Sequence, residues 1–587
     1  MAVGNHQTLF PQGMALQNIF QLHRLIRVAA ALVAVSCGLL AISAVAAPLN
    51  PEIKVGIKQR FGQQPKDQLV LQAQTGDRLT IKFWTNEKPV TAVVNKLQIS
   101  IAQEPLANPR VDERLVISTH RSFESAEASA KTWQAKGIAV ELAQPDNWQV
   151  WAKRDRYDST VSRLLLQQDL KSKGLTTSYI DQKTIKTRPI LSWELNGYRY
   201  NRHEVDISTD QNVIDVGTQR FGGRLRFQPN SYGSYTLVNQ VPVETYLRGV
   251  VPYEIGSKAP ETAVQAQTIL ARTYALRNLR RFKIDGYELC ATTQCQVYEG
   301  LNGTTPRSDQ SITATAGQVL TYDNELIDAL YSSTTGGVTA AFEDIWEGAP
   351  RPYLQPKIDA YPNRVWDLKS RNLSDEKAFQ AFIEIKQGFN EDGWGYLRWK
   401  TTAPLSKLNQ NLHDFLKKQQ HPLTAFSTIQ NLQVVARARS GRVQRLRVTT
   451  NLGAIDLAKD EILRAFEAPN SLLFYVEPIA GKDPKTVSGF AFVGGGLGHA
   501  VGLSQAGSYA LSQQGLSAPK ILDFYYPSTV LQPLSSKIIA WKDDALPAAL
   551  VSQNPQSEED SGFQIFGWKF PELGLKPILQ WFQSLSA

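Results

Sequence analysis

The stretch from residue 260 to residue 282, PETAVQAQTILARTYALRNLRRF, constrains the fold most. Pro260 suits the first turn of a helix, because it has no N–H to lose and its φ is already helical. One stripe of the predicted helix carries Val264, Ala271, Tyr274 and Ala275. The other alanines are small enough to let a second backbone approach closely. The stretch therefore predicts a rigid helix packed inside the protein.

One carboxylate, Glu254, lies between the apolar run of residues 247–251 and the start of this helix. We predict that it lies in a loop that the helix holds in place. Burial against neighbours such as Val251 and Ile255 would raise its pKa, as a general acid needs near neutral pH. The alternative is a surface carboxylate at a bend of the chain.

Three blocks between residues 241 and 300 resemble the sporulation stage II protein D (SpoIID/LytB-like) family: VPVETYLRGVVPYEI, ETAVQAQTILARTYAL and CATTQCQVYEG. Two later blocks agree in the same order, LYSSTTGGVTAAFEDIWEGAPRPYL from residue 330 and GGGLGHAVGLSQAGSYALSQQGLSAPKILDFYYPST from residue 494. The resemblance extends over roughly residues 193–535. It implies an α+β catalytic domain that acts on the glycan strands of peptidoglycan.

In that family the glutamate after Pro-x is the catalytic acid of a lytic transglycosylase, and Glu254 is the matching position. Such an enzyme uses one residue twice, first as an acid and then as a base that helps close a 1,6-anhydro-muramyl ring. A hydrolase would need a second carboxylate. Structural roles are the better prediction for Glu244 and Glu261, whereas Asp344 is an acid that could approach the site. Some relatives are described as enhancers of cell-wall amidases, so a non-catalytic wall-binding regulator is the alternative.

The family blocks also predict a substrate-binding wall, because amide, phenol and hydroxyl groups suit sugar hydroxyls. Its predicted members are Arg272, Gln296, Tyr298, Ser333, Thr335, His499, Ser504 and Gln505. The glycines around His499 permit close backbone approach. A serine hydrolase is excluded, because Ser504 and His499 share one loop without an acidic third member or a nucleophile elbow.

Cys290 and Cys295 form a close pair in a predicted loop. In an oxidising compartment the pair can form a small-loop disulfide, and disulfide or free thiols are favoured over metal binding. Some members of the family carry a histidine just before the second cysteine, and zinc has been assigned near it. This chain has Gln294 there, a poor zinc ligand. We therefore expect no cofactor, with zinc at the two cysteines as the weaker alternative.

The first 46 residues resemble a secretory leader. Residues 1–27 lack acids and end in a basic cluster, and the apolar run 28–47 includes Ala44-Val45-Ala46. A signal anchor that holds the chain in the cytoplasmic membrane is the alternative, because the run is nearly long enough to span a bilayer. Both predict an exported protein of the periplasm or cell envelope. Without residues 1–46, which contain Arg24 and Arg27 and no acid, 61 basic and 54 acidic residues remain, a formal charge of +7. This charge favours an anionic partner, and export favours the cell wall over nucleic acid. A charge that only keeps the protein soluble is the alternative.

Residues 114–174 predict the order strand, helix, strand, strand, helix, with Ser122 as an N-cap and Gly137 and Gly174 closing the two helices. This order resembles a SPOR domain, which implies binding of glycan strands that lack stem peptides. An ordinary α+β sandwich without a ligand is the alternative.

The chain as a whole predicts a multidomain α+β protein. The predicted parts are a signal peptide or anchor (1–46), a small β-rich region (47–105), a SPOR-like domain (106–185), a SpoIID-like catalytic domain (190–535), and a linker with an amphipathic tail (536–587). Within the catalytic domain, helices are predicted near residues 374–389 and 405–419.

Overall fold

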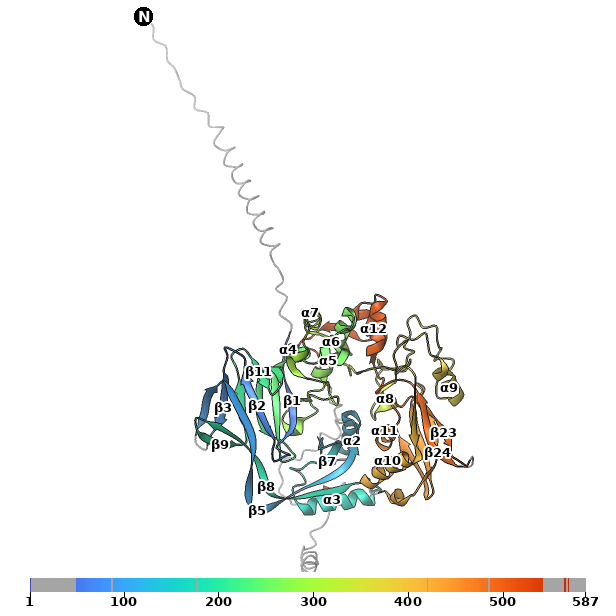
Figure 1. Ribbon diagram of the computed structural model, residues 1–587, viewed down its shortest axis with the longest axis horizontal. Helices are drawn as coiled ribbons and strands as arrows, with labels where there is room; N and C mark the ends of the chain where they lie inside the picture. The colour runs from blue at the N-terminus through green and yellow to red at the C-terminus, as the bar shows by residue number, and fades with distance from the viewer. Residues whose placement is uncertain are drawn as a thin grey trace, which may run out of the picture. The chain divides into compact units, whose positions relative to one another are not determined.

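The computed structural model describes residues 1, 49–85, 88–175, 177–419, 421–483 and 486–541, and the backbone of 564–565 and 568–569. The predicted leader and nearly all of the predicted tail lie outside the described residues. The chain divides into two units, Met1–Leu49 and Asn50–Ala587, and the second carries the α+β fold (Figure 1). Among the described residues no helix is long and apolar enough to cross a membrane.

A seven-stranded sheet joins the start of the second unit to residues far along the chain. Its order is β15-β1-β14-β13-β10-β3-β4. The strands are β1 (Glu52–Phe61), β3 (Leu79–Trp84), β4 (Pro89–Val94), β10 (Val205–Ser208), β13 (Arg224–Pro229), β14 (Tyr235–Pro242) and β15 (Leu289–Cys290). Because β1 pairs with β14 and β3 with β10, the predicted β-rich region shares its sheet with the predicted catalytic domain.

A second sheet contains eight strands. They are β2 (Gln68–Ala73), β5 (Lys96–His120), β6 (Val140–Ala143), β7 (Trp148–Ala152), β8 (Tyr179–Leu195), β9 (Tyr198–Arg202), β11 (Val213–Val216) and β12 (Gln219–Gly222). The long strands β5 and β8 pair with each other along most of their length. The first half of β5 and the last half of β8 pair with each other and, respectively, with β2 and β9. We call this part, together with the seven-stranded sheet, the β-rich layer. The other halves of β5 and β8 continue into the segment predicted to be SPOR-like.

That segment is a β-α-β-β-α-β unit inserted between the two halves of the β-rich layer. Helices α2 (Phe123–Ala135) and α3 (Thr160–Ser172) alternate with strands in the order β8-β5-β7-β6. Ser122 caps α2 as predicted, and Gly137 (φ 79°) and Gly174 (φ 90°) follow the two helices in conformations that favour glycine. The predicted element order is therefore confirmed.

Four helices follow strand β14, and α6 is the most deeply buried of them. They are α4 (Val243–Arg248), α5 (Val251–Ile255), α6 (Glu261–Arg277) and α7 (Pro306–Ala314). Pro260 is the N-cap of α6, one residue before the predicted first turn, and the helix ends at Arg277 because Asn278 caps it instead of continuing to Phe282. The stretch around Glu254 is the one-turn helix α5, so the prediction of a loop there was wrong.

The C-terminal half packs four small sheets against short helices. Its strands are β16 (Gln318–Tyr322), β17 (Glu325–Leu326), β18 (Tyr331–Ser332), β19 (Trp399–Pro404), β20 (Ile429–Arg437), β21 (Val443–Thr450), β22 (Gly453–Ala458), β23 (Phe474–Ala480), β24 (Val487–Gly494), β25 (Leu503–Ser504) and β26 (Val530–Pro533). Its helices are α8 (Phe342–Ile345), α9 (Glu376–Glu384), α10 (Leu405–Lys418), α11 (Asp460–Ala465), α12 (Gln505–Gln513) and α13 (Ala518–Tyr525). β18 pairs with β25, which brings the two later sequence blocks side by side.

Candidate active site

Glu254 lies near the end of α5, and its side chain is only partly exposed. The backbone N–H of Val297 donates a hydrogen bond of 2.6 Å to Glu254 Oε1. The Gln505 amide donates to the backbone oxygen of Glu254 at 2.9 Å. Three segments far apart in the sequence therefore meet at this one glutamate.

Burial raises the pKa of Glu254, and this effect outweighs the Val297 N–H and the Tyr331 and Gln505 side chains, which act in the opposite direction. None of these groups is a carboxylate. The glutamate therefore keeps its proton to a higher pH than an exposed one, and it does so because of burial rather than because of a second acid. That is the property of a general acid that works without a carboxylate partner.

Tyrosines surround this carboxyl group. Its charge contributes to the raised pKa of Tyr246 on α4, Tyr274 on α6 and Tyr331 on β18. Tyr331 Oη donates to Gln296 Oε1 at 2.9 Å, and Gln296 Nε2 donates to Tyr246 Oη at 3.2 Å. Gln296 is thus close to Glu254 as predicted, but it is buried and braces the tyrosines. Tyr331 was not predicted, although it directly precedes the hydroxyl-rich SSTTGG run.

A buried carboxylate, Glu391, holds the two later blocks together. It accepts hydrogen bonds from the Thr335 hydroxyl (2.8 Å), from Gly336 N (2.9 Å) and from the Ser504 hydroxyl (2.6 Å). Ser504 in turn caps α12 through Gly507 N, and Gln505 follows it. Thr335 and Ser504 are therefore anchors of the loops that reach Glu254. No sequence pattern indicated Glu391, which lies outside the family blocks quoted above.

A second buried acid, Asp359, lies next to Glu391. The Thr335 hydroxyl also contacts Asp359 Oδ2 at 3.0 Å, and the Tyr525 hydroxyl donates to Asp359 Oδ1 at 2.8 Å. Burial and the charge of Glu391 raise the pKa of Asp359 to about 7. The pair therefore shares less than two full negative charges near neutral pH.

His499 lies in the glycine-rich loop between β24 and β25. Its Nδ1 accepts from Val501 N at 3.0 Å, and its ring packs against Trp346 with 5.0 Å between ring centroids. Burial lowers the pKa of His499 to about 4, so the ring is neutral under physiological conditions. A neutral imidazole serves as a hydrogen-bonding group here rather than as a cation.

Known protein families and relatives match the part of the chain that contains this site. The family profile "Stage II sporulation protein" (SpoIID) matches residues 231–322, which hold Glu254 and the Val297 loop. The chain therefore contains a SpoIID domain. A second profile, a domain of unknown function named DUF8618, matches residues 340–502.

Three relatives give the extent of the similarity. The amidase enhancer of Bacillus subtilis (strain 168) is 28% identical over 305 residues, which are 49% of this chain and 40% of the relative. Stage II sporulation protein D of the same organism is 30% identical over 189 residues, 29% of this chain and 53% of the relative. An uncharacterized protein of Brachyspira hyodysenteriae is 25% identical over 311 residues, 52% of this chain and 70% of the relative. The chain thus spans less than two thirds of both Bacillus subtilis relatives.

Two predicted wall residues have buried partners in the SpoIID domain. Arg272 is fully buried, and its guanidinium binds Glu244 through two hydrogen bonds of 2.7 and 2.8 Å. Tyr298 is 1% exposed, and its hydroxyl donates to Asn239 at 2.7 Å. The structure therefore places both in the supporting core. Ser333 and Gln505 are partly exposed, whereas Thr335 and Ser504 are not.

Cys290 and Cys295 form a disulfide, with 5.6 Å between their Cα atoms. This is one of the states that the spacing left open. Both sulfur atoms are used in the bond, which closes a small loop directly before Gln296 and Val297. The disulfide thus constrains the segment that supplies the N–H donor to Glu254.

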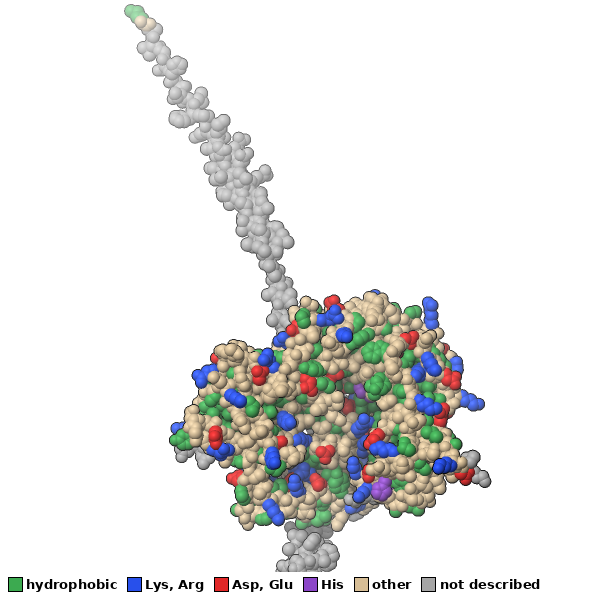
Figure 2. All heavy atoms as spheres, in the orientation of Figure 1, with side chains coloured by type: hydrophobic (Ala, Val, Ile, Leu, Met, Phe, Trp, Pro, Cys, Tyr) green, Lys and Arg blue, Asp and Glu red, His purple; other side chains and the backbone are tan. Residues whose placement is uncertain are grey.

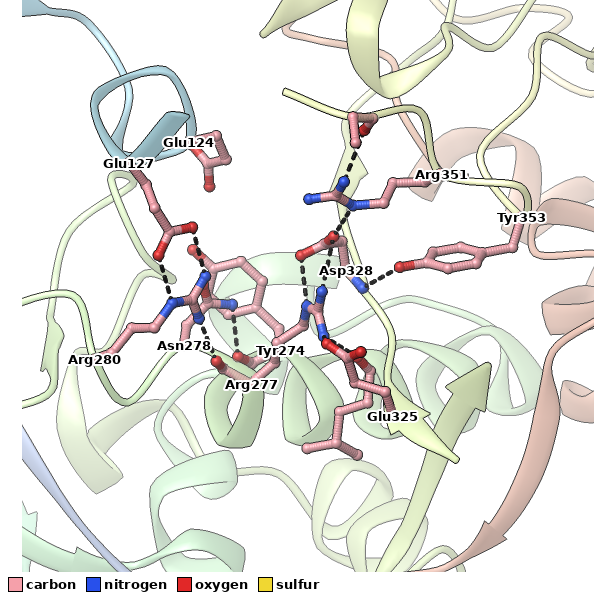
Figure 3. A network of polar contacts seen from close by, with 12 residues as sticks. Glu124, Glu127, Tyr274, Arg277, Asn278, Arg280, Glu325, Asp328, Arg351 and Tyr353 are labelled. Atoms are coloured by element: carbon pink, nitrogen blue, oxygen red, sulfur yellow. Dashed lines mark hydrogen bonds and ion pairs between the residues drawn. The ribbon is translucent and has the colours of Figure 1, made fainter. Parts of the chain in front are cut away.

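A cavity of about 590 Å³ lies at the junction between the inserted unit and the SpoIID domain. Glu124 and Glu127 of α2 line one side, and Arg277, Asp328 and Arg351 line another. Figure 3 shows Arg277 and Arg351 both bound to Asp328, with Glu325 on Arg277. Glu254 does not line this cavity. In Figure 2 basic and acidic side chains are interspersed over a face that is hollowed in its middle.

Proposed function

We propose that this protein is a peptidoglycan lytic transglycosylase with Glu254 as its catalytic residue. The observation that carries the proposal is the partly exposed carboxyl of Glu254, whose pKa burial raises while no second acid acts on it. A hydrolase of the common two-carboxylate type would need a partner acid at a fixed distance. A transglycosylase needs one group that gives a proton and then takes one back.

In the first step protonated Glu254 gives its proton to the glycosidic oxygen between MurNAc C1 and GlcNAc O4. The C1–O bond breaks, GlcNAc leaves with a free hydroxyl, and positive charge develops at C1. The Val297 N–H, 2.6 Å from Oε1, stabilises the carboxylate that this step creates. Without a hydrogen-bond donor, the free energy of forming a charged carboxylate in this buried position would be high.

In the second step the Glu254 carboxylate removes the proton from the C6 hydroxyl of the same MurNAc residue. O6 then bonds to C1 and closes the 1,6-anhydro ring. No water is consumed, and Glu254 ends protonated as it began. The partly exposed Ser333 and Gln505, together with neutral His499, are the groups we assign to sugar hydroxyls.

The alternative function is that of an amidase enhancer, which is the name of one relative. The amidase enhancer aligns with 49% of this chain, and a protein of that kind would bind the wall or an amidase without cutting glycan itself. Both proposals place the protein in the cell envelope, and both concern the wall.

The test incubates the full chain with purified glycan strands, with and without stem peptides, and analyses the products by mass spectrometry. We expect 1,6-anhydro-muramyl ends, and we expect Glu254→Gln to lower their rate of formation by about 10²- to 10⁴-fold, the usual contribution of a general acid. Glu261→Gln is the matched control, because Glu261 is an exposed residue at the start of α6.

Reducing ends in place of anhydro ends would overturn the transglycosylase and indicate a hydrolase. Intact strands with every variant, combined with faster peptide release when a cell-wall amidase is added, would favour the enhancer. Faster cleavage of peptide-free strands would support glycan binding by the inserted β-α-β-β-α-β unit.

A further inference from the structure

We infer that the inserted unit positions Glu254 through an ion pair between Glu124 of α2 and Arg281, which follows α6. The inference rests on the proposed role of Glu254 and adds a second pair of residues to it. Glu124 and Arg281 touch no reacting atom, so they are positioning residues. Their effect passes through the Cys290–Cys295 disulfide loop to Val297, which follows the loop and donates its N–H to Glu254.

Arg281 is 3% exposed, and each of its three guanidinium nitrogens has a partner. Nε donates to Asn278 Oδ1 at 3.0 Å, Nη1 donates to the backbone oxygen of Gln294 at 3.0 Å, and Nη2 binds Glu124 Oε1. The planar guanidinium group of Arg281 therefore connects the end of α6, the disulfide loop and the inserted unit. Burial acts to lower the pKa of Arg281, but Glu124 and its other neighbours outweigh burial and keep the charge in place.

Gln294 lies inside the loop that the Cys290–Cys295 disulfide closes. Cys295 N donates to Thr292 O at 2.9 Å, and Tyr298 N donates to Ala291 O at 3.1 Å, so the loop is tightly folded. Val297 lies two residues beyond Cys295, just outside the closed loop, and the Tyr298 N–Ala291 O bond holds this following segment against the loop. A shift of the Gln294 carbonyl is therefore passed to the N–H that binds Glu254 Oε1.

Removing the Glu124 carboxylate leaves a buried guanidinium without its counter-charge. A buried cation in that state turns toward solvent or draws in water, because an uncompensated buried charge is costly. Either change breaks the geometry that holds Nη1 on Gln294. We therefore expect the loop to loosen although the residues around Glu254 are all unchanged.

The same helix provides a matched control. One turn along α2, Glu127 binds Arg280 with distances of 2.6 and 2.8 Å (Figure 3). Arg280 donates its remaining bond to Arg277 O and not to the disulfide loop. Both pairs are Arg–Glu ion pairs at the same junction. Arg280 is more exposed than Arg281 (22% against 3% of the side chain) and has no hydrogen bond to the loop.

The experiment compares Glu124→Ala, Glu124→Gln and Glu127→Ala in the full chain by glycan cleavage and by amide hydrogen exchange of residues 291–298. We expect Glu124→Ala to lower kcat by about 10- to 100-fold, since a displacement of about 1 Å can cost about 10²-fold. Exchange of the Val297 amide should accelerate, because its acceptor is lost for part of the time. Glu124→Gln keeps an oxygen acceptor and should restore part of both.

The pH profile gives a further readout. Loss of the Val297 donor removes a group that lowers the pKa of Glu254, so the fall of kcat/KM at high pH should move to higher pH in Glu124→Ala. Equal effects of Glu124→Ala and Glu127→Ala on rate, exchange and pH profile would overturn the inference and indicate a general stabilising contact. If Glu254→Gln were as active as the parent, the proposed function would fail instead, and the exchange data would still decide whether Glu124 orders the loop.

Discussion

Val297 N lies 2.6 Å from Glu254 Oε1, and this one hydrogen bond joins two segments that are 43 residues apart. It resolves a conflict in the chemistry of the site. Burial keeps Glu254 protonated, but the reaction proposed here requires the same group to pass through its ionised state. A backbone donor fixed by a disulfide loop stabilises that state without adding a charge that would deprotonate the resting acid.

The first prediction concerns the pH dependence of glycan cleavage. Free enzyme must carry the proton on Glu254, whose pKa is raised above its ordinary value of 4.5 by burial. We expect kcat/KM to be level at low pH and to fall as pH rises through the raised pKa. A pH series from 4 to 9 on soluble glycan strands measures it. A midpoint at or below the ordinary value would contradict the assignment.

The second prediction is that Glu254→Gln stabilises the protein at alkaline pH. Because the folded pKa is raised, the contribution of Glu254 to stability is complete below its unfolded pKa and is lost as pH rises through the folded pKa. The amide has no such loss, and its oxygen can still accept from Val297. We expect a higher midpoint of thermal unfolding than the parent at pH 8 and no gain at pH 4. Glu261→Gln should match the parent at both.

Some parts of this architecture could be predicted from local sequence. The alanine-rich helix α6 and the strand and helix order of the inserted unit depend on periodicity, caps and glycines within a few residues. Glu254 and Gln505 were predicted through family blocks, and the structure brings them into contact. Short-range patterns were sufficient for α6 and the inserted unit because these features are short-range themselves, whereas the Glu254–Gln505 contact spans 251 residues and was expected only from the family resemblance.

Other parts depend on contacts between distant segments. Glu391 binds Ser504, 113 residues away, and neither neighbourhood shows that a carboxylate is needed there. Arg272 was predicted to face sugar, but its place on α6 points it at Glu244, which only the packing of α4 against α6 decides. Strand β5 runs continuously from the β-rich layer into the inserted unit. The boundary near residue 105, drawn from the alternation of apolar and polar residues, therefore lies inside one strand.

The third prediction concerns the disulfide. Replacing both Cys290 and Cys295 by serine removes a short closed loop, and the chain-entropy relation gives a loss of about 2 kcal/mol in the free energy of unfolding. Amide exchange of Val297 should accelerate, and glycan cleavage should slow. Reducing agent should have the same effects on the parent and none on the double variant. If the double variant kept full activity, the loop would not be what positions the donor.

The fourth prediction separates a structural from a substrate-binding role for Arg272. Its side chain is fully buried against Glu244, so Arg272→Gln leaves a partly buried carboxylate unpaired and should cost about 3–5 kcal/mol of stability. Arg248→Gln is the control, because the Arg248–Asp309 pair is exposed and should contribute about 0–1 kcal/mol. Denaturant unfolding measures both.

KM for glycan does not depend on how much of the enzyme is folded, and it should not change in Arg272→Gln. A large rise in KM with unchanged stability would instead return Arg272 to the substrate-binding wall.

The last prediction follows from the buried pair of Asp359 and Glu391. Burial and the charge of Glu391 raise the pKa of Asp359 to about 7, well above its unfolded value of 3.8. The stability that Asp359 contributes is therefore complete below about pH 4 and is lost as pH rises toward 7 and above. Asp359→Asn cannot ionise, so its stability should fall less steeply than that of the parent between pH 4 and pH 8. Chemical unfolding across that range measures the slope.

Asp328 gives the opposite control. Arg277 and Arg351 outweigh burial and hold the pKa of Asp328 well below its usual range, so its contribution is present at neutral pH and is lost in acid. Asp328→Asn should therefore be most destabilising at pH 8, where Asp359→Asn gains most relative to the parent. If the free energy of unfolding changed with pH in the same way in both variants, the two buried acids would not have opposite electrostatic environments. If it fell as steeply with pH in Asp359→Asn as in the parent, the group that titrates would not be Asp359.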